Sequence, residues 1–436
     1  MNEAQATPFY LRDNFAPVEE ETTADVLEVV GSIPPALNGR FLRNGPNPRS
    51  GWSDHWFLGN GMIHGVEFEN GKANWYRNRY VRTPLYEDPE GDPMEALLQP
   101  DKSAANTHVI HHAGKILALE EGHLPWELST GLDTLRAWDF DGKLNTAMTA
   151  HPKVCAETGE LLLFGYGVLP PFLTYHRVSP EGELVQSEEI TVPGSTMVHD
   201  FNVTRNHVIW MDLPAVFDLE SAAEGGLPIK WDESYGARLG VMPRNGGDAD
   251  VTWYDIDPCY VFHPLNAYED GDKIVIDVCR KKDVMAGSVE SPAMLTRWVI
   301  DTSAGTVSET QLDDRSTEFP RVCETVVGVK HRYGYMAGLA GSVPYAERYI
   351  KYDLNDASAR VVELGAGREG SEAVFVKDPA GTSEDDGWLM AYVHDKSRNK
   401  GEVLILDAST MSEEPIARVL LPARVPMGFH GSWIPF

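Results

Sequence analysis

Four histidines stand in apolar or aromatic surroundings and are spread over much of the chain. His151 and His263 are each followed by proline, His199 follows two apolar residues, and His430 follows a phenylalanine. A neutral imidazole is a good metal ligand, and a rigid proline beside it suits a side chain that must hold one orientation. A single histidine of this kind is more often a packed, hydrogen-bonded residue, but four of them together predict a metal centre.

The all-imidazole composition of this set bears on which metal it would hold. For zinc we expect a cysteine or carboxylate ligand, or three histidines and a water molecule. Iron sites with two histidines and one carboxylate keep coordination positions open for oxygen, and four histidines around an octahedral ion also leave positions open. Cys155 lies four residues after His151, and Cys259 lies four residues before His263. This spacing shares one face of a strand, so a zinc site with cysteine stays an alternative.

Three glutamates in apolar contexts could support the histidines: Glu121, Glu318 and Glu372. An imidazole that binds a metal usually donates its other N–H to a carboxylate or a carbonyl group. In a chain with 66 acidic residues, each of these glutamates could equally be an ordinary surface charge. The residues alone leave both interpretations open.

The composition is that of an acidic globular protein. In 436 residues, 66 Asp and Glu stand against 37 Lys and Arg, which gives a formal net charge of −29, and 42% of the residues are hydrophobic. A chain this acidic offers no basic surface that could release counterions from phosphates or bind an anionic membrane. Nucleic acid is therefore excluded as a partner, and the acidity is best explained by solubility.

The expected compartment is the cytoplasm. Residues 1–18 carry no apolar signal core, and no run of apolar residues is long enough to span a bilayer. Four cysteines are sparse for a chain of this length, so we expect reduced thiols. We expect no stable membrane insertion. A transient membrane contact and the oligomeric state stay open.

The spacings between the histidines are long and uneven, so they can meet only where separate strands reach a common axis. Short apolar or alternating segments are separated by glycine turns such as Asp141-Gly142-Lys143 and Asp270-Gly271-Asp272, as in β-hairpins. Helical periodicity is scarce. Regular hairpins without a linker predict an all-β propeller and one domain over residues 1–436. A β-helix or two β-sandwiches stay open, and we expect loop insertions at 81–105 and 214–247.

Motifs in nearly the whole chain, in the right order, resemble the carotenoid cleavage oxygenase family, which includes the lignostilbene dioxygenases. The stretches that carry the resemblance are Phe41–Pro48, Gly61–Gly65, Ala105–Val109 and His430–Trp433. The resemblance implies a seven-bladed β-propeller with a dome of loops and helix over one face. It also implies one Fe(II) per chain on the propeller axis.

Carried over motif by motif, the resemblance assigns roles to individual residues. The implied iron ligands are His151, His199, His263 and His430. The carboxylates that would each pair with one imidazole are Glu121, Glu318 and Glu372. The first histidine, His151, would then have no such partner. Thr107 would lie beside the open coordination position, although a strand threonine bonded to the backbone is an equally good interpretation.

The resemblance implies a non-haem iron dioxygenase that uses O2 to cleave a conjugated C=C bond into two carbonyl products, with no organic cofactor. Stilbene-cleaving members tend to place a lysine directly before the first of the three glutamates, where it meets a phenolic oxygen, but here that position is Glu120. A carboxylate repels a phenolate. We therefore predict a carotenoid or apocarotenoid substrate, with a stilbene or phenylpropenoid as the alternative, for which Tyr86 could bind the phenol.

The residues that bind the apolar substrate are not predicted individually. Aromatic candidates for the substrate tunnel, each equally suited to an ordinary core, are Trp126, Phe172, Phe262, Phe319, Phe429 and Trp433. Two further functions stay open: a non-catalytic propeller used as a scaffold, and an isomerohydrolase on the same iron site. The presence of all four histidines and all three glutamates argues against the scaffold. The acidic balance argues against the isomerohydrolase, because that branch works at membranes.

Overall fold

Strands dominate the computed structural model, which describes residues 7–88, 99–218, 228–284, 291–339, 341 and 343–436. Among these residues the only α-helix is the single turn α1 (Pro84–Glu87). Short 3-10 turns are η1 (Phe9–Leu11), η2 (Asp13–Phe15), η3 (Trp56–Leu58), η4 (Glu233–Tyr235), η5 (Asp248–Asp250) and η6 (Glu324–Val326). The expectation of an almost helix-free chain is confirmed for the described residues.

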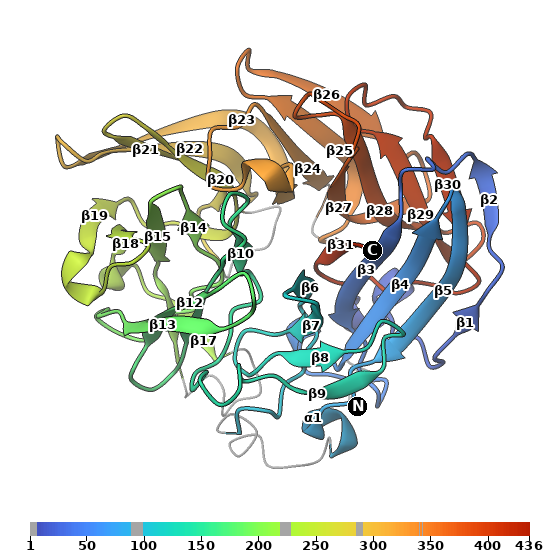
Figure 1. Ribbon diagram of the computed structural model, residues 1–436, viewed down its shortest axis with the longest axis horizontal. Coiled ribbons are helices and arrows are strands. Elements are labelled where there is room, and N and C mark those ends of the chain that lie inside the picture. The colour runs from blue at the N-terminus through green and yellow to red at the C-terminus, as the bar shows by residue number, and fades with distance from the viewer. Residues whose placement is uncertain (1–6, 89–98, 219–227, 285–290, 340, 342) are drawn as a thin grey trace, which may run out of the picture.

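The first four blades are separate antiparallel sheets arranged around a central axis (Figure 1). The first blade holds β31 (Gly431–Pro435), β3 (Gly39–Pro46), β4 (Gly61–Glu69), β5 (Lys72–Tyr80) and β1 (Thr23–Ala24). The second holds β6 (His108–His112), β7 (Lys115–Leu119), β8 (Trp126–Leu128) and β9 (Thr134–Ala137). The third holds β10 (Lys153–Val154), β11 (Leu161–Tyr166), β12 (Leu173–Val178) and β13 (Leu184–Glu189). The fourth holds β14 (Asn202–Val203), β15 (His207–Asp212), β18 (Ala237–Pro243) and β19 (Thr252–Ile256).

The last three blades share one continuous sheet. The fifth holds β20 (Tyr260–Asp270), β21 (Lys273–Lys281), β22 (Met294–Asp301) and the first part of β23 (Thr306–Arg321). The sixth holds the end of β23, β24 (Tyr333–Leu339), β25 (Ala346–Asp353) and β26 (Ser358–Glu363). The seventh holds β27 (Arg368–Lys377), β28 (Gly387–Asp395), β29 (Lys400–Asp407), β30 (Ala417–Leu420) and β2 (Glu28–Gly31).

Two features divide the continuous sheet into three blades. Strand β23 pairs with β22 along its first part and with β24 from Thr317 onward. Strands β25 and β27 share a single residue pair, Ala346 with Gly370. The predicted all-β, seven-bladed propeller is therefore confirmed, and the β-helix and the paired sandwiches were wrong alternatives.

Segments from opposite ends of the chain close the ring. Strand β31 pairs with β3 through five residue pairs, from Gly39–Pro435 to Arg43–Gly431. Strand β2 pairs with β30 and completes the seventh blade. The blue and red strands accordingly lie side by side in Figure 1. Because β31 follows His430 directly, this closure also fixes the last of the four histidines.

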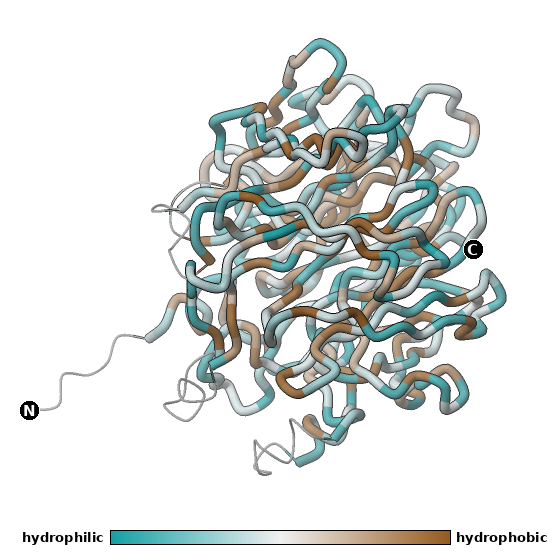
Figure 2. Tube along the Cα trace, turned by 90° about the vertical axis from the view of Figure 1, so that its left-hand side faces the viewer, coloured by the Kyte–Doolittle hydropathy of each residue, from teal (hydrophilic) through white to brown (hydrophobic). Residues whose placement is uncertain are grey.

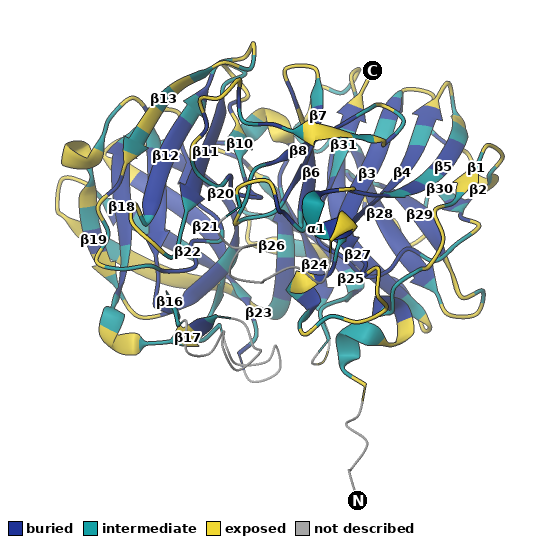
Figure 3. Cartoon of the chain, turned by 90° about the horizontal axis from the view of Figure 1, so that it is seen from below, coloured by how far each residue is buried: buried dark blue, intermediate teal, exposed yellow. Residues whose placement is uncertain are grey.

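One face of the ring carries a cap of short elements. The hairpin of β16 (Ala215–Phe217) and β17 (Ile229–Trp231) stands at one edge of this face (Figure 3), and η3 contributes to the same cavity wall. The predicted insertion at 214–247 was too long, because β18 lies within it as a full blade strand. Gly240 interrupts the alternating pattern in β18 and Pro243 ends the strand, which explains the error.

The core lies between neighbouring blades. Apolar side chains of β3–β5 pack against those of β27–β30. The Tyr392 hydroxyl lies across that boundary, 3.0 Å from the carbonyl oxygen of Phe41 and 3.2 Å from that of His64. Hydrophobic stretches run through the interior strands, and hydrophilic turns lie outside (Figure 2). Complete burial of a side chain such as Phe41 contributes about 1.5–3 kcal/mol. In the described part of the chain, no helix has the length and hydropathy needed to cross a bilayer.

Candidate metal centre

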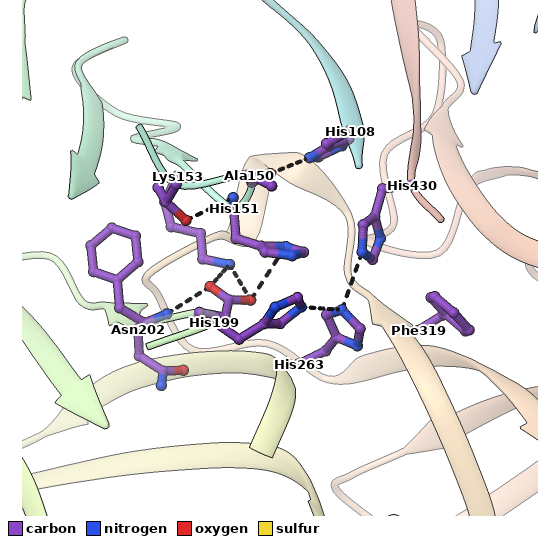
Figure 4. A network of polar contacts seen from close by, with 12 residues as sticks. His108, Ala150, His151, Lys153, His199, Asn202, His263, Phe319 and His430 are labelled. Carbon is purple, nitrogen blue, oxygen red and sulfur yellow. Dashed lines mark hydrogen bonds and ion pairs between the residues drawn. The ribbon is translucent and has the colours of Figure 1, made fainter. Parts of the chain in front are cut away.

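The four histidines meet on the propeller axis (Figure 4). His151 stands before β10, His199 before β14 and His430 before β31, while His263 lies within β20. Each therefore comes from the start of a different blade, and their candidate ligand nitrogens all lie within 4.8 Å of one another. Long, uneven spacings in the sequence become a compact cluster because every blade begins at the axis.

The imidazoles point their Nε2 atoms inward. The Nε2 atom of His263 lies 3.2 Å from that of His199 and 3.1 Å from that of His430. Their Nδ1 atoms point outward to carboxylates. His263 Nδ1 lies 2.6 Å from Glu318 Oε2.

The other two outward contacts follow the same pattern. His430 Nδ1 lies 3.0 Å from Glu372 Oε1, and His199 Nδ1 contacts Glu121 Oε1 directly. Glu121 follows β7, Glu318 lies in β23 and Glu372 in β27. Four histidines and three glutamates thus come one from each of the seven blades.

This geometry fits a bound cation. An ionised carboxylate only accepts hydrogen bonds, so an imidazole Nδ1 beside it carries the proton and leaves a lone pair on Nε2. Three such Nε2 atoms face one another at the cluster centre, and at 3.1–3.2 Å they need a proton or a cation between them. The donor set is all imidazole nitrogen, which suits ions such as iron, copper, nickel and zinc.

His151 completes the cluster by a different route. Its Nε2 atom is buried and has no hydrogen-bond partner. Its Nδ1 atom faces Asp200 Oδ2 at 3.7 Å, beyond hydrogen-bond distance. The Asp200 carboxylate instead accepts from the Lys153 ammonium at 2.7 and 3.0 Å. The buried, unbonded Nε2 of His151 is the second observation that fits a metal ion.

Burial controls the protonation of these rings. It lowers the pKa of His151 and His430 well below the ordinary value, and the neighbouring imidazoles lower it further. Burial also opposes the charged form of His199, but the charge and hydrogen bond of Glu121 more than offset it, so the pKa of His199 is raised. His151 and His430 are therefore neutral near pH 7, as a metal ligand must be.

Arg321 holds Glu372 in its ionised form. Burial by itself raises the pKa of a carboxyl group, but Arg321 and His430 together hold the pKa of Glu372 well below its ordinary value. The guanidinium donates to both carboxylate oxygens at 2.9 Å. Gly431 N also donates to Glu372 at 2.9 Å. The carboxylate is thus fixed in position and in charge behind His430.

Local backbone irregularities aim the side chains. In β20 the register with β21 shifts on both sides of Pro264, and such bulges redirect neighbouring side chains. Phe319 has a left-handed φ of 52°, rare for a bulky residue, at a shift in the pairing of β23 with β24. Its ring stacks on His263 at 5.4 Å. His430 N donates to Thr107 O, which ties the first blade to the second.

Two cavities reach the histidines. The first, the apolar cavity, has a volume of about 310 Å³ and lies under the cap, where His199, His263 and His430 form part of its wall. The second, the polar cavity, has a volume of about 520 Å³. The described residues that distinguish its wall are His151, Lys153, Asp200, Arg321 and Glu372. His263 and His430 line both cavities, so the cluster stands between them.

Thr107 lies in the wall of the apolar cavity, close to the three histidines that reach it. Its hydroxyl donates to Asn106 Oδ1 at 3.0 Å. The hydroxyl is thus bonded to a side chain, and its place beside an open coordination position stays a prediction. Asn106 is held in turn, because its amide donates to the carbonyl groups of Phe57 and Gly59.

Glu120 also lines the apolar cavity, but its carboxylate already accepts hydrogen bonds from neighbouring residues. It accepts from His123 Nδ1 at 2.6 Å and from Gly122 N at 2.8 Å. Burial opposes its ionisation, and these contacts nonetheless keep the pKa of Glu120 below its ordinary value. Tyr86 packs against Tyr80 and lies outside the described wall of the cavity, so the structure does not place it where a substrate phenol could bind.

The zinc alternative loses its geometric basis. The metal-binding group found among the described residues contains the four histidines and no cysteine. Cys259 is fully buried in an apolar cluster with Tyr260 and Met197, and burial raises its pKa to about 12. A thiol in that environment stays protonated and is a poor ligand.

Three of the six aromatic candidates line the apolar cavity: Phe262, Phe319 and Phe429. Trp126 belongs to a core cluster and Trp433 lines the polar cavity. Sequence reasoning missed further wall residues, which are Trp56, Phe57, Leu58, Tyr166, Met197, Phe217, Ile229, Lys281 and Leu339. Most belong to the cap or to strand ends, where no periodic pattern marks the direction of a side chain.

Comparisons with known proteins agree with the site. The family described as retinal pigment epithelial membrane protein (RPE65) matches residues 15–435. A carotenoid cleavage oxygenase of Mycobacterium tuberculosis is 40% identical, over 98% of this chain and 97% of its own length. A carotenoid 9,10(9′,10′)-cleavage dioxygenase of Crocus sativus is 37% identical, over 98% of this chain and 89% of its own.

Solved structures give the same result. A lignostilbene dioxygenase of Pseudomonas brassicacearum superposes with a TM-score of 0.89 at 28% identity, over 99% of both chains. A cobalt-substituted apocarotenoid oxygenase of Synechocystis superposes with a TM-score of 0.85 at 26% identity, over 96% of this chain and 97% of that one. The resemblance seen in the sequence motifs is confirmed, and the chain belongs to the RPE65 and carotenoid cleavage oxygenase family.

Proposed function

We propose that this protein is an iron-dependent dioxygenase that cleaves a conjugated C=C bond of a carotenoid or apocarotenoid. One C=C bond and one O2 molecule yield two C=O groups, so each product carries one oxygen atom from O2. The observation that carries the proposal is the set of inward-facing Nε2 atoms beside an apolar cavity. The family relationship supports the reaction class.

His151, His199, His263 and His430 would hold one Fe(II) per chain. Iron is favoured over zinc because the set lacks both cysteine and carboxylate, and four nitrogens leave positions open on an octahedral ion. The bound Fe(II) would supply the activation of O2. Glu121, Glu318 and Glu372 would fix the tautomer and orientation of three rings and strengthen them as donors.

The chain's own residues would bind and orient the substrate. A conjugated chain would lie against the rings of Phe262, Phe319 and Phe429, which exclude water from the bond that reacts. Thr107 would stand beside the open coordination position, with its hydroxyl held by Asn106. The reaction requires no general acid or base, and the protein contributes binding, orientation and the tuning of the metal.

A stilbene or phenylpropenoid is the second candidate substrate. The structural match to a lignostilbene dioxygenase favours it. Pairing of Glu120 with His123 also weakens the repulsion that such a carboxylate would exert on a phenolate. The higher identity to carotenoid-cleaving relatives keeps a carotenoid or apocarotenoid as the first candidate.

We also propose that residues 1–436 act as one domain in the cytoplasm, with no nucleic-acid partner and no stable insertion into membranes. Completion of two blades by strands from opposite ends of the chain supports the single domain. The four cysteines are buried and free, which suits a reducing compartment. The net charge of −29 supports the absence of nucleic-acid binding.

The test is aerobic turnover of a panel by the purified, iron-loaded protein, with products identified by mass spectrometry. The panel holds a β-apocarotenal, a full carotenoid, resveratrol and isoeugenol. Carbonyl products from a carotenoid or apocarotenoid support the proposal, and products from the phenols alone move the function to the second candidate. No carbonyl product from any of the four, at full iron occupancy, would refute C=C cleavage.

A further inference from the structure

One cationic side chain lines the apolar cavity in the described part of the chain. Lys281, the last residue of β21, is the only lysine or arginine among the described residues of the cavity wall. The rest of that wall combines aromatic and aliphatic side chains with histidines and glutamates, and its neutral polar residues include Asn106, Thr107, Ser291 and Ser316. Lys281 is half-buried, at the point where β21 ends beside this cavity.

Lys281 stands toward the metal end of the cavity. Its ammonium nitrogen lies 5.8 Å from the centroid of the Phe262 ring. The Phe262 ring meets the His199 ring edge-on, with centroids 5.1 Å apart. The ammonium also interacts electrostatically with Glu318, the carboxylate behind His263. One aromatic ring therefore separates Lys281 from the histidine cluster.

The ammonium can serve a substrate while it keeps its protein contacts. Burial lowers the pKa of Lys281, and the charges of Glu318 and Asp283 oppose that shift and favour the charged form. A lysine ammonium has three N–H donors, so a contact with a carboxylate leaves it able to donate elsewhere. An oxygen atom on the substrate is an acceptor complementary to such a donor.

We propose that Lys281 selects conjugated substrates that carry an oxygen acceptor on the part lying beside β21 and the end of β23. The acceptor is a hydroxyl, carbonyl or phenolate oxygen, and the hydrocarbon analogue of the same shape binds less well. This inference rests on the proposed function and deepens it, because it assigns specificity to a residue remote in sequence from Glu120 and Glu121.

A second role must be separated from this one. Lys281 could act only through Glu318 and so position His263. A positioning role would change iron occupancy and would affect all substrates alike. A specificity role would leave iron occupancy unchanged and would affect oxygenated substrates alone. The two roles therefore predict different results in the same experiment.

The experiment compares wild type, Lys281→Met and Lys281→Arg on matched pairs: zeaxanthin with β-carotene, and resveratrol with trans-stilbene. Lys282→Met is the control, because Lys282 is exposed and does not line the cavity. Loss of one charge-assisted hydrogen bond predicts a fall of about 10- to 100-fold in kcat/KM for the oxygenated member, mostly through KM. The hydrocarbon member should be little affected, and arginine should restore part of the preference.

Binding is measured separately, from the polyene or stilbene absorbance under anaerobic conditions, so the test does not depend on turnover. A failure of all substrates to react would refute the proposed function, and the binding ratios would still test Lys281. If only one pair shows the preference for the oxygenated member, that pair identifies whether Lys281 recognises the oxygen of a carotenoid or that of a stilbene. Equal losses for both members of a pair with reduced iron content, or no change in either ratio, would overturn the assignment.

Discussion

Three of the four histidines are backed by a glutamate, and His151 is not. His263 and His430 contact Glu318 and Glu372 at 2.6 and 3.0 Å, whereas His151 faces Asp200 at 3.7 Å. The nearest carboxylate to His151 is taken by Lys153 at 2.7 Å. His151 is instead held through its backbone N–H, which donates to the Thr149 hydroxyl.

We attribute the difference to charge balance around the proposed Fe(II). Fe(II) and Arg321 together would neutralise the three glutamates that contact the rings, and Lys153 neutralises Asp200. A fourth carboxylate bonded to a ring would leave a net negative charge buried on the axis, which is costly. The comparison shows that three rings are held by a carboxylate at Nδ1, whereas the carboxylate facing His151 is held by Lys153.

The largest effect is expected when a histidine ligand that contacts a glutamate is removed. His263→Ala removes one of four nitrogens and also the imidazole that contacts the Glu318 carboxylate. We expect iron occupancy near zero and turnover reduced by about 100-fold or more, beyond the range for supporting residues. Metal analysis and product assays measure both, with circular dichroism as the control for folding. Full occupancy with normal activity would remove His263 from the site.

Loss of a supporting carboxylate should be less severe. Glu372→Gln keeps the size of the side chain but removes the charge that faces His430 and Arg321. We expect iron affinity or activity to fall by about 10- to 100-fold, with Glu318→Gln in the same range. Iron retention during dialysis against a chelator is the measurement. Wild-type retention in both variants would show that the glutamates do not tune the ligands.

The depressed pKa of Glu372 predicts a pH dependence of the stability of the metal-free protein. The folded-state pKa of Glu372 is depressed, so its contribution is fully present above the unfolded value of 4.5 and is lost as the pH falls through the folded value. Glu372→Gln should therefore be less stable than wild type at pH 7, and the difference should shrink below about pH 4.5. Urea unfolding at several pH values measures it; a constant difference down to pH 3 would contradict the prediction.

The smallest effect is expected behind His151. Because no hydrogen bond joins Asp200 to the ring, Asp200→Asn should change iron affinity by less than about 10-fold, below the range of the glutamates. Lys153→Met alone should lower the free energy of unfolding more than Asp200→Asn does, because it leaves the buried Asp200 carboxylate without its cation. The double variant should recover part of that loss. An Asp200→Asn defect as large as that of Glu372→Gln would erase the distinction between His151 and the other rings.

The fold could be predicted from glycine turns between short strands, because hairpins leave local signals. The blade count could not, since blade boundaries depend on pairing between distant residues such as Ala346 and Gly370; only the family resemblance supplied it. Likewise His199 was evident, but the role of its neighbour Asp200 was not, because that role depends on Lys153 from another blade. Lys281 was missed because the cavity that it lines is formed by residues that are distant in the sequence.

The most direct test measures iron content and product labelling on one sample. The purified protein is analysed for metals and then supplied with a β-apocarotenal under ¹⁸O2. We expect close to one iron per chain and one labelled oxygen in each of two carbonyl products. Zinc in place of iron, or products without label at full iron occupancy, would contradict oxygen-dependent cleavage at the four-histidine centre.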